Sequence, residues 1–146
     1  MVSGYATTAD LTPTMLQAAG EAPPSDPPMD GGSLLVPGNA RLTAARSRVY
    51  MEYFHDPLYP DVPSWGSILS PAAHYVAWYA PDGTVTFREY YDLTKDPFEL
   101  NNLLGNADPS DDPDVSPLDA QLVHDRSCRG LTGPKACPAG SDSPAP

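Results

Sequence analysis

The stretch HYVAWYAPDGTVTFREYY, residues 74–91, decides the fold. Both halves are rich in the β-branched and aromatic residues that favour strands, and apolar and polar side chains alternate in the second half. Between the halves stands the tripeptide Pro-Asp-Gly at residues 81–83, which is typical of a tight turn. The stretch therefore predicts a β-hairpin with strands at residues 74–80 and 84–91.

Two segments before the hairpin have the composition of further strands. RSRVYMEYF at residues 46–54 alternates and is rich in aromatic residues, and WGSIL at residues 65–69 is a shorter candidate. Three prolines interrupt the chain between them. Antiparallel pairing of these segments with the hairpin predicts a sheet of three or four strands.

A helix is predicted after the sheet, in SPLDAQLVHDRSC at residues 116–128. A serine cap, a proline at the first helical position and Asp119 at the third are typical of a helix start. Leu118, Leu122 and Val123 form its apolar edge. The economical architecture is α+β, a small antiparallel sheet with this helix packed across one face.

The segment DPFELNNLLG, residues 96–105, predicts a short helix between the hairpin and the C-terminal helix. Aspartate as the cap, proline as the first residue and glutamate as the third form a capping box with a preset first turn. The residues in these roles are Asp96, Pro97 and Glu99; Leu100, Leu103 and Leu104 face the sheet, and Gly105 ends the helix.

The N-terminal segment TADLTPTMLQAA, residues 8–19, predicts another helix. Leu11, Met15 and Leu16 form an apolar stripe on it. Because proline is tolerated only in a first turn, Pro13 places the start near residue 11 or 12, and Gly20 ends the helix. The candidate caps are Asp10 and Thr12.

Prolines and glycines limit the amount of regular structure. The 146 residues include 19 Pro and 11 Gly, so the ordered segments are short and the core is small. Two of the glycines, Gly31 and Gly32, follow Asp30 and predict a tight reversal of the chain after the N-terminal helix.

The charge balance excludes two classes of partner. Eight Lys plus Arg stand against 19 Asp plus Glu, and the net charge of −11 repels nucleic acids and anionic lipids alike. No window approaches the roughly 18 apolar residues of a membrane span. Residues 1–22 have neither a basic n-region nor an apolar h-region, so we identify no export signal. We expect no nucleic-acid and no membrane partner.

Two cysteines, Cys128 and Cys137, lie in the sequence SCRGLTGPKACP, whose glycines and proline allow the chain to bend between them. In an oxidising compartment they form a disulfide that closes a small loop, worth roughly 2–3 kcal/mol on the chain-entropy account. The alternative is a reduced, inert pair. Zinc is not expected, because no further ligands stand at finger-like spacing.

The region of residues 89–103 resembles a known family. Its pattern E-x-Y-D-L-x-x-D-P-x-E-x-x-N-L is similar to the C-terminal motif of sulfatases, the arylsulfatase and N-acetylglucosamine-6-sulfatase-like enzymes of the alkaline-phosphatase-like superfamily. Four other pieces resemble the family in the same order: DLTPTMLQAAG, MDGGSLL, RVYMEYF, and WGSIL followed by HYVAWY. The resemblance spans residues 8 to about 137. The residues of the motif are Glu89, Tyr91, Asp92, Leu93, Asp96, Pro97, Glu99, Asn102 and Leu103.

Three positions depart from the family pattern. His74 stands where many members have lysine, Leu69 where many have arginine, and Tyr90 where an aliphatic residue is usual. These departures bear on substrate contacts more than on the fold.

The chemistry that the resemblance implies belongs to an intact parent enzyme. Sulfate ester hydrolysis requires a strong nucleophile, cations and an acid for the leaving oxygen. Sulfatases use a formylglycine made from a C-x-P-x-R motif and a calcium ion held by an N-terminal α/β domain. This sequence has no such motif, since Cys128 is followed by Arg-Gly and Cys137 by Pro-Ala. We predict no catalytic residue, metal ligand or cofactor here, and expect calcium and formylglycine only in the parent.

Two acidic segments are weighed as metal sites. Asp92, Asp96 and Glu99 have the right ligand type, but helix capping and turns account for all three. PSDDPD at residues 109–114 lacks the glycine and the ligand spacing of an EF-hand loop, so we predict a solvated acidic loop.

Three residues are candidates for a substrate-facing rim. His74 is one because it replaces the family's lysine, and His55 and Trp65 flank a proline-stiffened loop with Tyr59. No triad is predicted, because the sequence brings no two of His55, His74 and His124 together. Core packing is the alternative role for the tryptophans and the strand tyrosines.

We predict three parts along the chain. Residues 1–45 are the end of a sulfatase catalytic domain, residues 46–137 its C-terminal subdomain and residues 138–146 a disordered tail. Leu11, Met15 and Leu16 then face a missing catalytic domain, so the chain alone exposes an apolar face.

Three hypotheses for function follow. In the first, the chain is a C-terminal fragment of a sulfatase-like hydrolase that supports the catalytic domain and supplies part of the pocket rim. Its partners are then the missing domain or a partner chain and, in the parent, a sulfated glycan or an aryl sulfate. In the second, it is a free-standing acidic module that binds a glycan or a protein. In the third, it is a decayed remnant. The compartment stays open, since the family is often exported.

Overall fold

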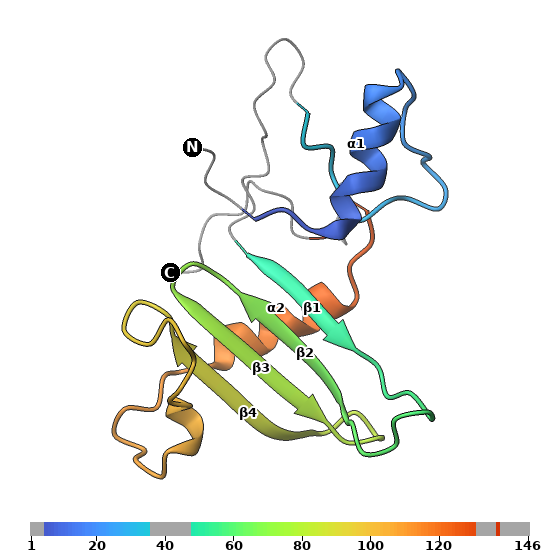
Figure 1. Cartoon of the computed structure of the whole chain (residues 1–146). Coiled ribbons are helices and arrows are strands. Elements are labelled where there is room, and N and C mark those ends of the chain that lie inside the picture. Colours follow the sequence, from blue (N-terminus) through green and yellow to red (C-terminus); the bar gives the residue numbers. More distant parts are fainter. Residues whose placement is uncertain (1–4, 36–47, 131–136, 138–146) are drawn as a thin grey trace. The chain divides into compact units, whose positions relative to one another are not determined.

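The computed structural model describes residues 5–35, 48–130 and 137 (Figure 1). The chain divides into two compact units, Met1–Val49 with Ser127–Pro146, and Tyr50–Arg126. Within the described ranges, no helix is long and apolar enough to cross a membrane. The predicted domain boundaries and the predicted disordered tail at residues 138–146 stay predictions, and the tail lies outside the described residues.

A four-stranded antiparallel sheet is the main element of the structure (Figure 1). Its strands lie side by side in chain order, and β3 pairs antiparallel with both β2 and β4. The predicted hairpin is confirmed, with Gly83 at φ 86° in the turn. The strand predicted at residues 46–54 is shorter, and residues 46 and 47 lie outside the described part of the chain. The strands are β1 (Val49–Tyr53), β2 (Ser64–Leu69), β3 (Ala73–Tyr79) and β4 (Val85–Asp92).

The helix α2 (Ser116–Arg126) crosses behind the sheet in Figure 1, which confirms the predicted α+β architecture. A Cβ added at Gly66 of β2 meets the Leu122 Cδ1 atom at 3.4 Å, so helix and strand approach closely there. The buried core lies between these two layers. Its members are Ile68, Tyr75, Ala77, Tyr79 and Leu122, with Leu104 and Leu118 partly buried against them.

The start of α2 differs from the prediction. Ser116 is the first residue of the helix rather than the residue before it, and its backbone N–H donates to the Asp114 carboxylate at 2.9 Å. Asp119 lies in the first turn, as predicted, and its side chain accepts a hydrogen bond from the Tyr75 hydroxyl of β3 at 2.5 Å. The predicted apolar edge is right for Leu122 and wrong for Val123, which is 70% exposed.

The helix predicted at residues 96–105 is absent from the structure. The chain makes turns there, followed by a single 3-10 turn, η2 (Leu103–Gly105). The capping box fails because Glu99 has a φ of 56°, which is outside the helical region, and its carboxylate contacts His74. The Asp96 carboxylate instead accepts from the Asn101 N–H at 2.8 Å. Leu100 is exposed rather than turned to the sheet.

The side chain of Asn102 joins this segment to β4 by hydrogen bonds. Its side-chain oxygen accepts from the backbone N–H groups of Tyr90 and Leu104, and its Nδ2 donates to the Arg88 carbonyl. The Asn102 amide thereby pairs with a backbone N–H and a backbone carbonyl on the outer edge of β4, as a neighbouring strand would.

The N-terminal segment forms a short 3-10 turn, η1 (Thr8–Asp10), and then α1 (Leu11–Ala18), as predicted. Of the two candidate caps, Asp10 stands at the N-cap position of α1, but its side chain makes no capping hydrogen bond to that helix and instead accepts from the Thr7 N–H at 2.8 Å, at the start of η1. Gly20 has a φ of 80° and ends the helix, and the Glu21 N–H returns to the Leu16 carbonyl. Leu11 and Met15 are exposed.

The connector after α1 is held against the start of the helix. The other oxygen of Asp10 accepts from the Gly32 N–H at 2.9 Å. A Cβ at Gly31 comes within 2.0 Å of the Ala9 carbonyl oxygen, so only glycine fits. The predicted reversal is misplaced, because the tight turn lies in the bridge of Ser25 with Pro28 and the chain only bends at Asp30.

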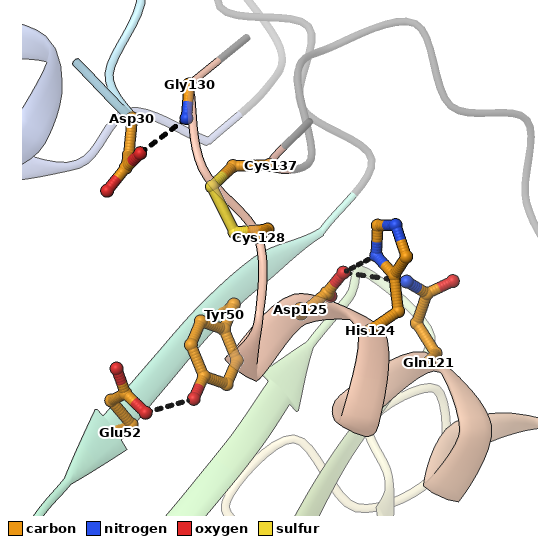
Figure 2. The surroundings of a disulfide bond; sticks show 9 residues. All are labelled: Asp30, Tyr50, Glu52, Gln121, His124, Asp125, Cys128, Gly130 and Cys137. Atoms are coloured by element: carbon orange, nitrogen blue, oxygen red, sulfur yellow. Dashed lines mark hydrogen bonds and ion pairs between the residues drawn. A yellow bond between two sulfur atoms is a disulfide. The ribbon is translucent and has the colours of Figure 1, made fainter. Parts of the chain in front are cut away.

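Cys128 and Cys137 form a disulfide, with their Cα atoms 4.7 Å apart (Figure 2). The Cys137 N–H donates to the Gly130 carbonyl, and the Gly130 N–H donates to the Asp30 carboxylate at 2.7 Å. The oxidised alternative of the sequence analysis is therefore the one that the structure contains.

Candidate functional site

The sheet has two faces with different surroundings. Side chains of Tyr75, Ala77 and Tyr79 on β3 belong to the core with Leu122 and therefore point to α2. Because successive residues of a strand point to opposite faces, the alternate residues of β2, β3 and β4 share the other face. We call this other face the far face. It consists of Trp65, Ser67, Leu69, His74, Val76, Trp78, Phe87, Glu89 and Tyr91, with register pairs Trp65–Trp78, Ser67–Val76, Leu69–His74, Trp78–Phe87, Val76–Glu89 and His74–Tyr91.

A carboxylate lies at the centre of a hydrogen-bond network on the far face. Glu89 accepts from the Trp78 indole N–H at 2.6 Å and from the Tyr91 hydroxyl at 2.7 Å. Burial, and then the hydrogen bond to Glu89, raise the pKa of Tyr91 to about 12. The hydroxyl therefore stays protonated and acts as a donor throughout the neutral range.

A histidine–carboxylate pair lies beside this network. The Nδ1 atom of His74 is 3.0 Å from the Glu99 carboxylate, and the imidazole ring is 6.4 Å from the Tyr91 ring. Glu99 reaches His74 from the loop after β4, and its φ of 56° is uncommon for a residue with a side chain. Such conformations persist where surrounding contacts fix them, as they do here.

Two polar atoms of the far face are buried without a hydrogen-bond partner among the described residues, His74 Nε2 and Ser67 Oγ. When Nδ1–H of a neutral imidazole donates to a carboxylate, Nε2 is left as an acceptor. Glu99 thus holds the His74 ring in one orientation, and Nε2 is the ring nitrogen without a partner among the described residues. Ser67 and His74 are diagonal neighbours across β2 and β3, so their two atoms lie in the same part of the face.

The three predicted rim residues do not meet in one place. Trp65 and His74 share the far face, but Trp65 lies four residues from the partner of His74, Leu69, which is roughly 13 Å along the strand. Trp65 stacks at a tilt on Trp78, with ring centroids 6.3 Å apart. His55 lies in the loop after β1, where its Nδ1 is 3.2 Å from the Val62 carbonyl.

The third histidine takes a separate position on α2. His124 Nδ1 is 3.1 Å from the buried Asp125 carboxylate, which also accepts from the Gln121 amide (Figure 2). Each of the three histidines thus has a different partner: the Val62 carbonyl for His55, Glu99 for His74 and Asp125 for His124.

The residues weighed as metal ligands have other partners. Asp92 binds the Lys95 ammonium at 2.8 Å, and this contact, with the Thr94 hydroxyl, lowers the pKa of Asp92 to about 2. Asp96 holds the Asn101 N–H and Glu99 holds His74. In the part of the chain that the structure describes, no three His, Cys, Asp or Glu side chains gather as metal ligands would.

Sequence reasoning missed the network around Glu89 and the partner of His74. The spacing Glu-x-Tyr on a predicted strand was an available signal, because residues i and i+2 share a face. Glu99 had no such signal, since its role depends on a backbone angle that helix-start statistics do not anticipate.

The comparisons with known proteins agree on one family. Residues 2–126 match the family described as N-sulphoglucosamine sulphohydrolase, C-terminal. The structure of BT4656 in complex with its substrate D-glucosamine-2-N,6-O-disulfate is similar to this chain with a TM-score of 0.54 and 26% identity. A putative sulfatase from Bacteroides thetaiotaomicron VPI-5482 is similar with a TM-score of 0.52 and 24% identity, a likeness of fold. No curated protein sequence matches.

The chain corresponds to a part of each solved structure. The match with BT4656 covers 78% of this chain and 22% of that one. The match with the putative sulfatase covers 92% of this chain and 30% of that one.

Proposed function

Because the chain belongs to the family described as N-sulphoglucosamine sulphohydrolase, C-terminal, we propose that it is the supporting C-terminal part of a sulfatase-type hydrolase. The family match over residues 2–126 is the observation on which the proposal rests. The reactive groups then come from residues outside this sequence. The lack of a C-x-P-x-R motif supports this division, because sulfate ester hydrolysis needs a nucleophile that the present residues do not supply.

The sheet serves in this proposal as a rigid support. We call the face of the sheet that α2 covers the near face. Leu122 fills the core between α2 and this face, and Asp119 accepts the hydrogen bond of the buried Tyr75 hydroxyl, so this core needs no further partner. The far face has half-buried aromatic rings, Trp65 and Trp78 among them, and such a surface favours burial against another body. The catalytic part of the enzyme, or a partner chain, is the proposed body.

His74 is the proposed contribution of this chain to the substrate pocket. The side chain of His74 is 17% exposed, and Glu99 fixes the orientation of its ring. The exposed part of the His74 side chain is proposed to contact a sulfated glucosamine, the substrate class of BT4656; the Nε2 atom itself is buried within this chain. The rim roles of Trp65 and His55 stay predictions.

Two measurements test the proposal. The DNA sequence immediately upstream of the codon for Met1 is expected to encode a C-x-P-x-R motif in the same or an adjacent reading frame. Calorimetric titration of the purified chain with D-glucosamine-2-N,6-O-disulfate is expected to show no saturable binding. Saturable binding by the chain alone, without any neighbouring sulfatase sequence, supports the free-standing glycan-binding module instead and contradicts the proposal.

A further inference from the structure

The loop that joins β1 to β2, residues 54–63, is well ordered by its own hydrogen bonds. The Tyr59 N–H donates to the Asp56 carbonyl at 2.8 Å, and the Val62 N–H donates to the Tyr59 carbonyl at 3.0 Å. The Asp56 carboxylate accepts from the Leu58 N–H, and His55 contacts the Val62 carbonyl. Prolines at positions 57, 60 and 63 restrict the backbone further. The loop is therefore preorganised, which lowers the entropy lost on binding.

This ordered loop directs apolar side chains to solvent. Phe54, Leu58 and Tyr59 are 62%, 80% and 60% exposed, and Val62 is 39% exposed. Single exposed apolar residues are normal, but four within nine consecutive positions form a patch that water solvates poorly. Aromatic residues in such patches are typical anchors of protein interfaces.

The charged side chains of the loop and of the strands next to it in the sequence have one sign. Residues 49–87 contain no lysine and no arginine, and their charged side chains are Glu52, Asp56, Asp61 and Asp82. Asp82 lies in the β3–β4 turn, at the same end of the sheet as the loop because the strands alternate in direction (Figure 1). Arg126 of α2 also lies at this end, 4.1 Å from the centre of the Tyr79 ring, so the uniform negative charge belongs to the loop and its neighbouring turn rather than to the whole end of the sheet.

We propose that the β1–β2 loop is a docking site for a protein whose surface has an apolar pocket bordered by lysine or arginine. The apolar side chains supply the contact area, and the carboxylates attract and orient the basic border. The negative border disfavours anionic lipids and sulfated glycans, and it disfavours a second copy of this chain, whose net charge is also −11. The inference goes beyond the proposed support role, since it concerns the end of the sheet rather than its far face.

The test uses the full chain with the photoreactive residue p-benzoylphenylalanine in place of Leu58. A matched control has it in place of Val123, which is 70% exposed on α2. Each protein is irradiated in an extract of the cells that encode it, and the cross-linked peptides are mapped by mass spectrometry. A cross-link from position 58 alone, to a peptide that combines apolar residues with lysine or arginine, is expected.

Two changes then distinguish the proposed partner from chance contact. The Asp61→Lys substitution is expected to lower the cross-link yield from position 58 at least about tenfold, the scale of a lost interface anchor. About 1 M NaCl, where the Debye length is about 3 Å, is expected to lower it as well. Thermal unfolding of Asp61→Lys is the control for folding.

Four results overturn the proposal: equal yields from positions 58 and 123, no cross-link from position 58, a cross-link indifferent to Asp61→Lys and salt, or binding of the chain to phosphatidylglycerol vesicles or heparin. None of these results bears on the family or on the support role, which rest on the far face and the sequence match.

Discussion

The two faces of the sheet differ in how completely they are satisfied. On the face that α2 covers, the buried Tyr75 hydroxyl donates to Asp119, and Arg88 joins the same carboxylate at 3.1 Å. On the far face, Ser67 Oγ and His74 Nε2 are buried without a hydrogen-bond partner in the described ranges. One face pairs its buried polar groups with each other, and the other holds two buried polar atoms that have no partner among the described residues.

This difference between the faces indicates where substitutions are expected to change stability most. Buried polar groups in native proteins are nearly always paired, so an unpaired one indicates strain, a ligand or a missing neighbour. If the near face alone holds the unit together, changes there are costly and changes on the far face are not. The predictions below run from the largest expected effect to the smallest.

Truncation of the near-face core is expected to be the most damaging change. Leu122 is fully buried against β2 and β3, so Leu122→Ala is expected to lower the free energy of unfolding by about 2–5 kcal/mol. Chemical denaturation measures this. The neighbouring change Val123→Ala, at an exposed position, is expected to alter it by less than about 0.5 kcal/mol. Equal costs at the two positions contradict the assigned packing of α2.

Loss of the near-face acceptor is expected to cost less. Asp119→Ala leaves the buried Tyr75 hydroxyl without its acceptor, at about 1–3 kcal/mol. Adding Tyr75→Phe removes the orphaned hydroxyl, so the double variant is expected to be at least as stable as Asp119→Ala alone. If the double variant loses as much free energy of unfolding as the two single variants added together, the assigned hydrogen bond between Tyr75 and Asp119 is contradicted.

On the far face, the raised pKa of Tyr91 is expected to be measurable by alkaline titration. Because the folded-state pKa of Tyr91 is raised to about 12, the folded protein keeps a proton that the unfolded chain releases near pH 10. The stability from this group is therefore fully present below pH 10 and is lost as the pH rises towards 12. NMR of ¹³C-labelled tyrosine, assigned with Tyr91→Phe, measures the titration. Glu89→Gln is expected to lower the pKa only in part, since burial is the larger cause.

The smallest effect is expected at Ser67. Ser67→Ala removes an unsatisfied buried oxygen, so the free energy of unfolding is expected to stay unchanged or to rise by up to about 1 kcal/mol. Thermal or chemical denaturation of the isolated chain is sufficient. A loss above about 1 kcal/mol shows a hydrogen bond at Ser67 and removes one of the two observations that distinguish the far face.

The elements of the sheet and the helices were predictable because local rules agree with the tertiary fold. The hairpin of β3 and β4 combines strand-forming residues with a Pro-Asp-Gly turn, and no competing contact alters it. Gly20 ends α1 for the same reason, since its positive φ is what a helix C-terminus requires.

The segment after β4 was not predictable, because tertiary contacts override its local preference. Asp96, Pro97 and Glu99 match a capping box, yet the contact of Glu99 with His74 and the contacts of Asn102 with β4 select turns instead. Asp119 departs from its capping role for a similar reason, since it pairs with Tyr75 across 44 positions of sequence. The candidate site depends on these long-range pairs, and single-sequence patterns contain no information on them.

The positions of the histidines show the same limit. The sequence identified His74 by its departure from the family pattern, but not Glu99 as its partner. It also placed His55 and Trp65 beside one loop, and the His55 N–H does donate to the Ser64 hydroxyl next to Trp65, whereas His74 of β3 pairs with Leu69 at the other end of β2.

The central proposal is that this chain supports sulfatase chemistry whose reactive groups come from residues outside this sequence. The most direct test is sulfate release from D-glucosamine-2-N,6-O-disulfate by the purified 146-residue chain, with calcium present, followed by ion chromatography. The account predicts no release above the rate in buffer. Release that is proportional to the concentration of the chain contradicts it.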